Sequence, residues 1–280
     1  MANIAEKIVF LEMVSCEVPE YAELLLLFRE LYTLGDGREG ETGISFTPPG
    51  EGIGEMVRGG FPLITPAEMA VDALKAASFL AAVVGVMARV GREGDEALGK
   101  LRDALTGGAL DPAPLFAACL KRERGALEGC AALLDIPAPL LEFVIETALR
   151  TALERFADSL QPALFEGWGE AYCPVCGSRP GMAELAGEEG KRFLCCSACS
   201  YSWPFTRIKC AFCGCEEPEK LSYFEAGEGP VRVDVCRTCS RYIKTRDSRR
   251  GHAGVPLDAE DLATIHLDLL AAREGFERGK

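Results

Sequence analysis

The sequence has very little histidine. Its 280 residues include two, and none precedes His252. Residues 1–165 therefore lack the side chain that most often acts as a general base, and they show no nucleophile paired with one. We expect His252 to lie in a loop and His266 to be a partly buried structural residue. The sequence predicts no catalytic residues and no enzymatic activity.

Basic charge is also in short supply. The chain carries 30 Lys and Arg against 43 Asp and Glu, which gives a net charge of −13. Residues 173–245 hold ten basic and nine acidic side chains, and the thiolates described below make this region negative even with two divalent ions bound. Because DNA and RNA binding requires a basic surface, we expect no nucleic-acid partner and favour a protein partner.

Long apolar stretches are absent as well. The longest runs from Ala76 to Ala88 between two charged residues. It falls short of the roughly 20 apolar residues that cross a bilayer, so it predicts a buried helix and no membrane span. The N-terminal residues lack the basic and apolar regions of a secretory signal, which predicts a protein of the reducing cytoplasm.

Cysteine, in contrast, is abundant and concentrated. Ten of the 13 cysteines fall between Cys173 and Cys239, and eight of these form CxxC pairs. Two CxxC turns that face each other surround one tetrahedral ion with four sulfurs, a geometry that zinc and iron accept. Pairing in chain order, with one short β-ribbon for each site, predicts two four-thiolate metal sites. The predicted ligands are Cys173, Cys176, Cys196 and Cys199 in the first site, and Cys210, Cys213, Cys236 and Cys239 in the second.

The same cysteines admit a different interpretation as disulfides, redox dithiols or scattered buried thiols. Repeated CxxC pairs at ribbon spacing, in a chain without an export signal, favour metal binding. Gly177 and Gly214 each follow a CxxC pair, where a positive φ lets backbone N–H groups turn toward the sulfurs. The isolated cysteines in the N-terminal part are expected to be core residues: Cys16, Cys119 and Cys130.

The chain divides by composition into unlike parts. Ala- and Leu-rich residues 1–165 predict a helical bundle, whereas nine glycines between Gly35 and Gly60 predict a long flexible loop within it. A last helix, from Leu257 to Gly275, is expected to bury Leu262, Ile265, His266, Leu269 and Leu270. Periodicity and helix-start signals place the earlier helices at 20–34, 65–90, 95–105, 111–134 and 137–160.

The predicted fold class is α+β. An N-terminal α-helical bundle precedes two small four-cysteine β units, rubredoxin-like or zinc-ribbon-like, and a C-terminal helix. Aromatic residues near the cysteines are expected to form the small cores of these units: Tyr201, Trp203, Phe205 and Phe212. The predicted domains are 1–166 (helical), 167–207 and 208–246 (the two metal ribbons), and 247–280 (loop and helix).

Four knuckles occur in order in the cysteine-rich region. They lie within the strings Tyr172–Pro180, Leu194–Cys199 followed by Trp203, Arg207–Gly214, and Cys236–Thr245 with its Tyr-x-Lys tail. With these strings the region resembles the formate dehydrogenase accessory protein family, FdhE. The match covers about 168–276, and its closing helix corresponds to Asp261–Leu270. Cys195 and Cys215 are thiols additional to the family pattern.

The resemblance implies a cytoplasmic assembly factor that binds the catalytic subunit of a molybdenum- or tungsten-dependent formate dehydrogenase. It also implies rubredoxin-like sites with iron as the expected metal, although zinc accepts the same four thiolates. The leading hypothesis is a metal-stabilised scaffold that holds the client enzyme. The alternative is a redox protein that passes electrons to the client, with Cys195 and Cys215 expected as exposed thiols. Basic residues are expected to compensate the thiolate charge or to contact the client: Arg207, Arg237, Arg241 and Lys244.

Overall fold

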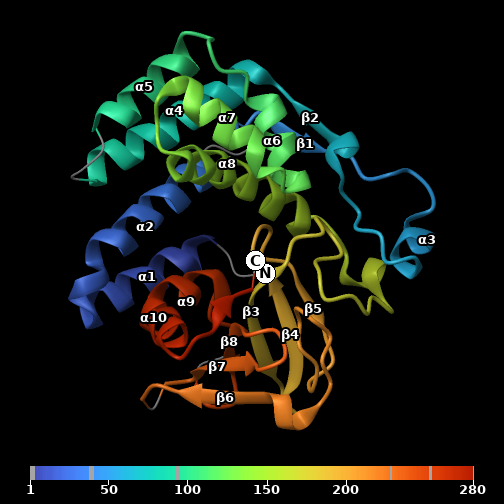
Figure 1. Cartoon of the computed structure of the whole chain (residues 1–280). Coiled ribbons are helices and arrows are strands. Elements are labelled where there is room, and N and C mark those ends of the chain that lie inside the picture. The colour runs from blue at the N-terminus through green and yellow to red at the C-terminus, as the bar shows by residue number, and fades with distance from the viewer. Residues whose placement is uncertain (1–3, 38–40, 92–94, 228, 252–253, 280) are drawn as a thin grey trace. The chain divides into compact units, whose positions relative to one another are not determined.

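The chain folds into one helical unit and one unit built around a β-sheet (Figure 1). The computed structural model describes residues 4–37, 41–91, 95–227, 229–251 and 254–279. The helical unit comprises residues 11–50 and 64–159, and the sheet unit comprises 1–10, 51–63 and 160–280. The boundary at residue 10 falls within the first helix, α1 (Ile4–Glu17). The predicted fold class, with helices first and two four-cysteine groups after them, is confirmed.

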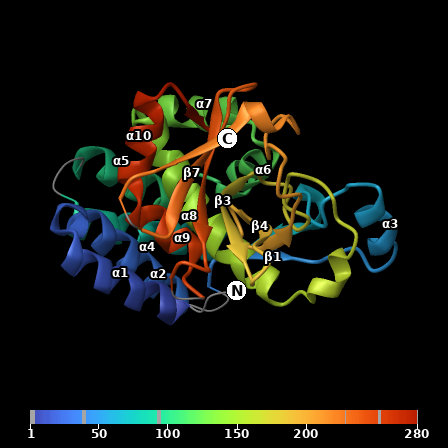
Figure 2. The same cartoon turned by 90° about the horizontal axis from the view of Figure 1, so that it is seen from below.

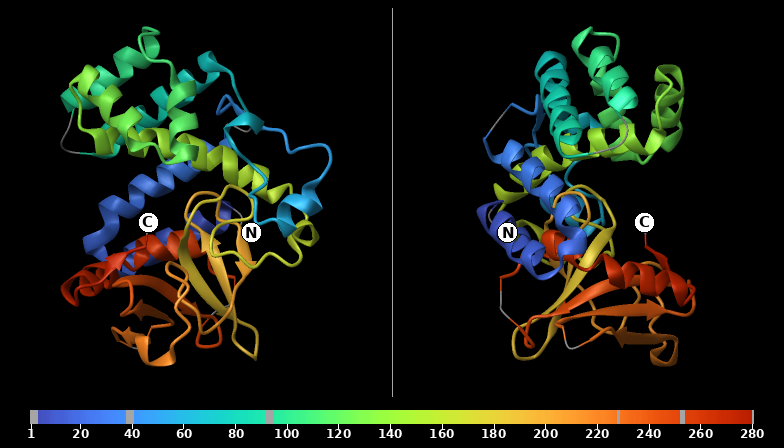
Figure 3. Two further views of the ribbon diagram at one scale, coloured as in Figure 1. Left: turned by 45° about the vertical axis from the view of Figure 1, so that its right-hand side comes forward. Right: turned by 90° about the vertical axis from the view of Figure 1, so that its left-hand side faces the viewer.

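The helical unit is a bundle organised around α8, which is yellow-green in Figure 3. Along α8 the buried side chains recur at helical spacing, from Leu141 and Val144 to Leu153 and Ala157, and they pack against α4, α6 and α7. A 3-10 turn, Pro19–Tyr21, leads into the first helix of the bundle. The helices are α2 (Ala22–Gly37), α4 (Ala73–Val90), α5 (Asp95–Thr106), α6 (Pro112–Lys121), α7 (Arg124–Leu134) and α8 (Ala138–Asp158).

Helix α4 is, within the described residues, the one helix long and apolar enough to cross a membrane. Core helices of globular proteins satisfy the same criterion. Phe79, Leu80, Val83 and Val84 of this helix are buried, and α4 packs against α2, α5 and α8. These contacts make it a core helix of the bundle.

Two of the helices predicted before the cysteine-rich region are divided in the structure. The capping box at Thr65 forms as predicted, but it caps a 3-10 turn, Pro66–Glu68, and α4 begins only after Asp72, whose side chain accepts a hydrogen bond from the Lys75 backbone N–H. The predicted helix 111–134 breaks at Arg122, which adopts a left-handed φ of 61° and separates α6 from α7. A helix-start signal in the sequence thus predicted where a helical turn begins, but it did not predict the length of the helix.

The prediction of a flexible loop between Gly35 and Gly60 is wrong for much of this segment. It contains β1 (Ile44–Phe46), which pairs with β2 (Met69–Val71), and helix α3 (Ile53–Arg58). Gly43 explains part of this order: a Cβ there would lie 2.4 Å from the Ala76 backbone nitrogen. Glycine thus permits the close backbone approach of this segment to α4.

The sheet unit contains a seven-stranded sheet in the order β5-β4-β3-β8-β7-β6, with β9 beside β8. Each predicted ribbon forms three antiparallel strands, and the parallel pairing of β3 with β8 joins the two ribbons into one sheet. The predicted domain boundaries themselves stay predictions. The strands are β3 (Pro180–Ala186), β4 (Lys191–Cys196), β5 (Ser202–Pro204), β6 (Leu221–Glu225), β7 (Val231–Cys236), β8 (Arg241–Asp247) and β9 (Glu277–Arg278), and 3-10 turns lie at Pro162–Phe165 and Pro218–Lys220.

Two helices at the end of the chain, α9 (Leu257–Ala263) and α10 (Ile265–Arg273), lie along the sheet (Figure 2). The sequence predicted a single helix in this region. The helix instead breaks at Thr264, so α9 and α10 bury faces that do not continue one another. His266 is exposed and Leu269 is 59% exposed, which corrects their predicted burial. His252 lies outside the described residues. The core beneath the helices is formed by Met182, Cys195, Val231, Val233, Val235, Tyr242, Leu257, Leu267 and Ala271.

A buried ionic network attaches these helices to β8. The Lys244 side chain is 0% exposed, and its Nζ donates to the Asp268 carboxylate at 2.7 Å and to the Asp261 carbonyl at 2.7 Å. The Tyr242 hydroxyl donates to the same Asp268 carboxylate at 2.7 Å. Residues two apart on a strand point to one face, so Tyr242 and Lys244 reach the helices together.

Replacing Lys244 by Met should lower the free energy of unfolding by about 3 kcal/mol, because it removes the buried cation and leaves the partly buried carboxylates of Asp261 and Asp268 to Arg278. Tyr242→Phe removes one hydrogen bond to a charged group and should cost about 1.5 kcal/mol. Lys191→Met at a 73% exposed position is the control, with an expected change within about 0.5 kcal/mol. Denaturant titration of the metal-loaded chain measures all three. A cost for Lys244→Met no larger than that of the control would contradict the anchoring role.

Candidate metal centres

The first group of sulfurs comes from the two turns of the β3–β4–β5 ribbon. Cys173 and Cys176 lie in the turn before β3, and Cys196 and Cys199 in the turn after β4. The Sγ atoms of Cys173 and Cys199 are 3.4 Å apart, and Cys176 Sγ lies 3.5 Å from Cys196 Sγ and 3.7 Å from Cys199 Sγ. All four side chains are buried.

The second group repeats this arrangement in the β6–β7–β8 ribbon. The Sγ atoms of Cys210 and Cys239 are 3.8 Å apart, and those of Cys213 and Cys236 are 3.6 Å apart. Here Cys213 is exposed and Cys239 is partly exposed. The structure thus brings together the eight predicted cysteines in the two predicted sets of four.

The spacing of the sulfurs fits a metal ion. A tetrahedral ion with metal–sulfur bonds of about 2.3 Å holds its sulfurs about 3.8 Å apart. In both groups the ligand atoms lie within 4.8 Å of one another, and all the cysteines of the chain are free thiols. Each group could therefore hold one ion, and four thiolates are a donor set that both zinc and iron accept.

The four CxxC turns share one backbone conformation. The residue after each pair is left-handed: Gly177 with φ 69°, Ser200 with φ 54°, Gly214 with φ 73° and Ser240 with φ 54°. The turn lets backbone N–H groups point at sulfur, as the Phe212 N–H does to Cys210 Sγ at 3.4 Å. Glycine occupies this position in the first turn of each ribbon, as predicted, and serine occupies it in the second.

A segment distant in sequence covers the first group. The Leu63 backbone N–H donates to the Pro174 carbonyl at 2.8 Å, inside the first CxxC turn, and the Tyr172 hydroxyl donates to the Gly60 carbonyl at 2.6 Å. Tyr201 and Trp203, buried as predicted, complete the enclosure. Residues 60–63 are thus a part of this site that sequence reasoning missed, because no local pattern connects them with the cysteines.

Protons are held unevenly among the thiols of the metal-free chain. Burial raises the pKa of Cys173 and Cys199, whereas hydrogen bonds from the neighbouring thiols, Cys173 first, lower the pKa of Cys176. In the second group burial raises the pKa of Cys239. Burial also opposes ionisation of Cys236, yet backbone N–H groups of its turn lower the pKa of that thiol to about 7. Because an ion must displace the remaining protons, metal affinity falls as the pH falls.

Comparison with protein families supports the resemblance seen in the cysteine-rich region. Residues 208–280 match the family model described as FdhE, C-terminal domain, and residues 172–207 match that described as FdhE, central domain. Residues 172–280 thus match the two domains of the FdhE family in chain order. The two matched domains meet between β5 and the third CxxC pair, so each FdhE domain contributes one four-cysteine group.

Named relatives agree with this assignment. A protein FdhE homolog of Aquifex aeolicus (strain VF5) is 39% identical over 141 residues, which are 49% of this chain and 49% of that protein. A protein FdhE homolog of Pseudomonas aeruginosa is 34% identical over 200 residues, 63% of each chain. The matched region thus spans about half the length of the Aquifex relative and under two thirds of the Pseudomonas one.

The fold agrees over a longer range than the sequence. The crystal structure of the FdhE protein from Pseudomonas aeruginosa resembles this structure with a TM-score of 0.69. The alignment covers 98% of this chain and 93% of that chain at 22% identity. At this identity the comparison shows a shared fold, which includes the helical unit.

The structure explains the Tyr-x-Lys tail that the chain has in common with the FdhE family. Lys244 does not compensate thiolate charge, which corrects its predicted role, because its Nζ is bonded to Asp261 and Asp268 of the closing helices. Arg237 is exposed, and its backbone N–H donates to the Lys220 carbonyl at 2.9 Å. Arg207 and Arg241 line a pocket beside the second group, described below.

The additional thiols lie in unlike surroundings. Cys195 is buried under α9 and α10, which corrects its predicted exposure, and burial raises the pKa of its thiol. Cys215 is partly exposed and accepts a hydrogen bond from the Thr238 hydroxyl at 3.3 Å. Cys16 is exposed, contrary to its predicted place in the core, and Cys119 and Cys130 are partly exposed.

The second group should release its ion to a chelator about tenfold faster than the first, a difference of about 1.4 kcal/mol in local protection. The reason is the exposure of Cys213, whereas the first group is fully enclosed. Cys176→Ser leaves the second group intact and Cys213→Ser leaves the first, so release from each can be followed with a chelating dye. Release should increase as the pH falls, because protons compete with the ion for the thiolates. Equal rates from the two variants would contradict this account.

Proposed function

We propose that this chain is an accessory protein that binds the catalytic subunit of formate dehydrogenase during its maturation in the cytoplasm. The metal ligands are the eight cysteines of the two groups, and the chain itself carries out no catalysis. The observation that carries the proposal is the presence of both complete four-cysteine groups within one sheet. The match of residues 172–280 to the FdhE domain models, and the similarity to proteins named FdhE homolog, support the choice of client.

The ions would act as crosslinks that fix the shape of the binding surface. Cys196 and Cys236 end β4 and β7, and each ion would connect such a strand end to the CxxC turn that begins the same ribbon. A short turn buries little apolar surface of its own, so metal binding supplies much of its stability. When bound, the ion also neutralises thiolate charge in surroundings where burial opposes ionisation.

The family resemblance favours iron in both groups, and zinc fits the same donors. Free thiols throughout the chain are those expected of a reducing compartment. A redox role gains no support from Cys195, because its thiol is buried with a raised pKa and points into the core under the helices. The scaffold is therefore the function that the arrangement of the described residues supports best.

Loss of either ion should weaken capture of the client. Cys176→Ala and Cys213→Ala should each reduce the metal content from two ions per chain to one, and co-purification with the formate dehydrogenase catalytic subunit should fall about tenfold or more, equivalent to about 1.4 kcal/mol of binding energy. Cys16→Ala, an exposed cysteine outside both groups, is the matched control and should behave as the wild type. Metal analysis and quantitative co-purification provide the two readouts. Wild-type capture by a metal-depleted variant would refute the scaffold role.

A further inference from the structure

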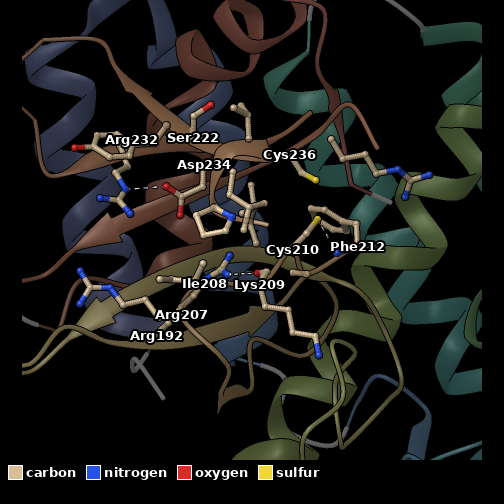
Figure 4. Close-up of a pocket in the computed structure, with 17 residues that line it drawn as sticks. Arg192, Arg207, Ile208, Lys209, Cys210, Phe212, Ser222, Arg232, Asp234 and Cys236 are labelled. Atoms are coloured by element: carbon tan, nitrogen blue, oxygen red, sulfur yellow. Dashed lines mark hydrogen bonds and ion pairs between the residues drawn. The ribbon is translucent and has the colours of Figure 1, made fainter. Parts of the chain in front are cut away.

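A pocket of about 230 Å³ lies beside the second four-cysteine group (Figure 4). Strand alternation places it on the face of the sheet that turns away from α9 and α10. Val231 and Val233 pack under the helices, whereas Arg232 and Asp234, between and after them, line the pocket. Cys210 and Cys236 lie at one end of it. The pocket thus borders the second four-cysteine group, and two of the four cysteines form part of its wall.

The lining is strongly cationic. Five basic side chains surround the pocket against one carboxylate, and some of them have partners already: Arg232 Nε lies 2.8 Å from an Asp234 oxygen, and Lys209 pairs with Glu216 at 2.9 Å. The charged lining residues are Arg192, Arg207, Lys209, Arg232, Arg241 and Asp234.

Arg192 is the residue that indicates a ligand. Its side chain is buried, with 7% of the residue exposed, and its Nη1 donates to the Lys209 carbonyl at 2.7 Å. Its Nε is buried without a hydrogen-bond partner among the described residues, and no carboxylate of those residues lies within ion-pair distance of this guanidinium. The bond through Nη1 leaves Nε and Nη2 as the open edge, the edge that pairs side-on with two carboxylate oxygens.

Such a cation is costly without an anion. A buried charge loses several kcal/mol of hydration unless a partner replaces the water. The nearby Asp234 charge offsets part of this penalty, and Arg232 adds to it. The same loss of hydration on burial lowers the pKa of Arg192. Arg207 adds a second guanidinium, whose Nη1 donates to the Glu189 carbonyl at 3.3 Å rather than to a carboxylate.

The remainder of the pocket is apolar. Ile208 is 56% exposed and Tyr223 is 57% exposed at its rim, whereas the lining residues Ala211 and Ile243 are buried. The volume is below the roughly 300 Å³ at which sites for drug-sized ligands begin, so the pocket suits a small molecule or the end of a chain.

We propose that this pocket binds a carboxylate carried on a short apolar body, with the open edge of Arg192 and the guanidinium of Arg207 holding the carboxylate. The carboxylate comes from a small organic acid or from the C-terminal residue of a polypeptide. The inference is independent of the client named above. A guanidinium fork matches a planar carboxylate, and the apolar lining accommodates the group attached to it.

The test is an NMR titration of the full chain, loaded with zinc in both groups and labelled at the isoleucine methyl groups. The probe is N-acetyl-leucine, and N-acetyl-leucine amide is its neutral counterpart. The methyl signals of Ile208 and Ile243 should shift with a Kd of about 1 mM, as expected for so small a ligand, whereas Ile145 in the helical unit should not shift. The amide should bind about tenfold more weakly.

Variants locate the carboxylate. Arg207→Gln and Arg192→Lys should each weaken binding about tenfold, while Arg237→Gln, an exposed arginine outside the pocket, should leave it unchanged. Measurement of the metal content checks that each variant is folded. If Arg192→Lys is not folded, binding by the Arg207→Gln variant, changed at an exposed residue, tests the proposal. Acetyl-alanyl-alanyl-leucine with a free carboxylate distinguishes the two sources: tighter binding than N-acetyl-leucine indicates a polypeptide end, and equal binding a small acid.

Several results would overturn the proposal. The first is the absence of methyl shifts at about 20 mM N-acetyl-leucine, well above the expected Kd of about 1 mM. The second is binding of the amide, or of inorganic phosphate, as tight as that of N-acetyl-leucine. Loss of binding in Arg237→Gln as large as in Arg207→Gln would overturn it as well.

Discussion

Four sulfur atoms that converge on one point at the end of each ribbon are the constraint on which the sheet unit depends. Thiols that lie 3.4–3.8 Å apart cannot all ionise without a cation between them, and burial raises the pKa of Cys173 and Cys199. A divalent ion resolves this conflict, because it replaces the protons and holds the two turns of a ribbon together. The left-handed residue after each CxxC pair, and the backbone N–H groups that it directs at sulfur, prepare the turns for that ion.

The two centres are embedded differently in the same sheet. The first is covered by residues 60–63 and by Tyr201 and Trp203, so its ion would be enclosed by protein on all sides. The second has an exposed ligand, Cys213, and a cationic pocket beside it. Since β3 and β8 pair directly, backbone hydrogen bonds connect the ribbons of the two centres. The first group is therefore enclosed like a structural crosslink, whereas the second is open to solvent at Cys213.

Local sequence signals predicted the metal groups well and their surroundings poorly. CxxC spacing is a local property, so all eight cysteines and their pairing into two sets could be predicted. The parallel β3–β8 pairing joins strands far apart in the chain, and no local pattern announces it. The burial of Cys195 could have been predicted, because neighbouring residues on a strand point to opposite faces and Cys196 points to the four-cysteine group. The role of Lys244 could not be predicted, because it depends on the position of Asp268, which is set by the packing of α10 against the sheet.

The central claim is that each group of four cysteines holds one ion, and metal-edge X-ray absorption on the full chain purified without oxygen tests it most directly. Together with quantification of the metal, the spectrum should show two ions per chain, each with four sulfur neighbours at about 2.3 Å. Fewer than one ion per chain, or nitrogen and oxygen ligands in place of sulfur, would contradict the account.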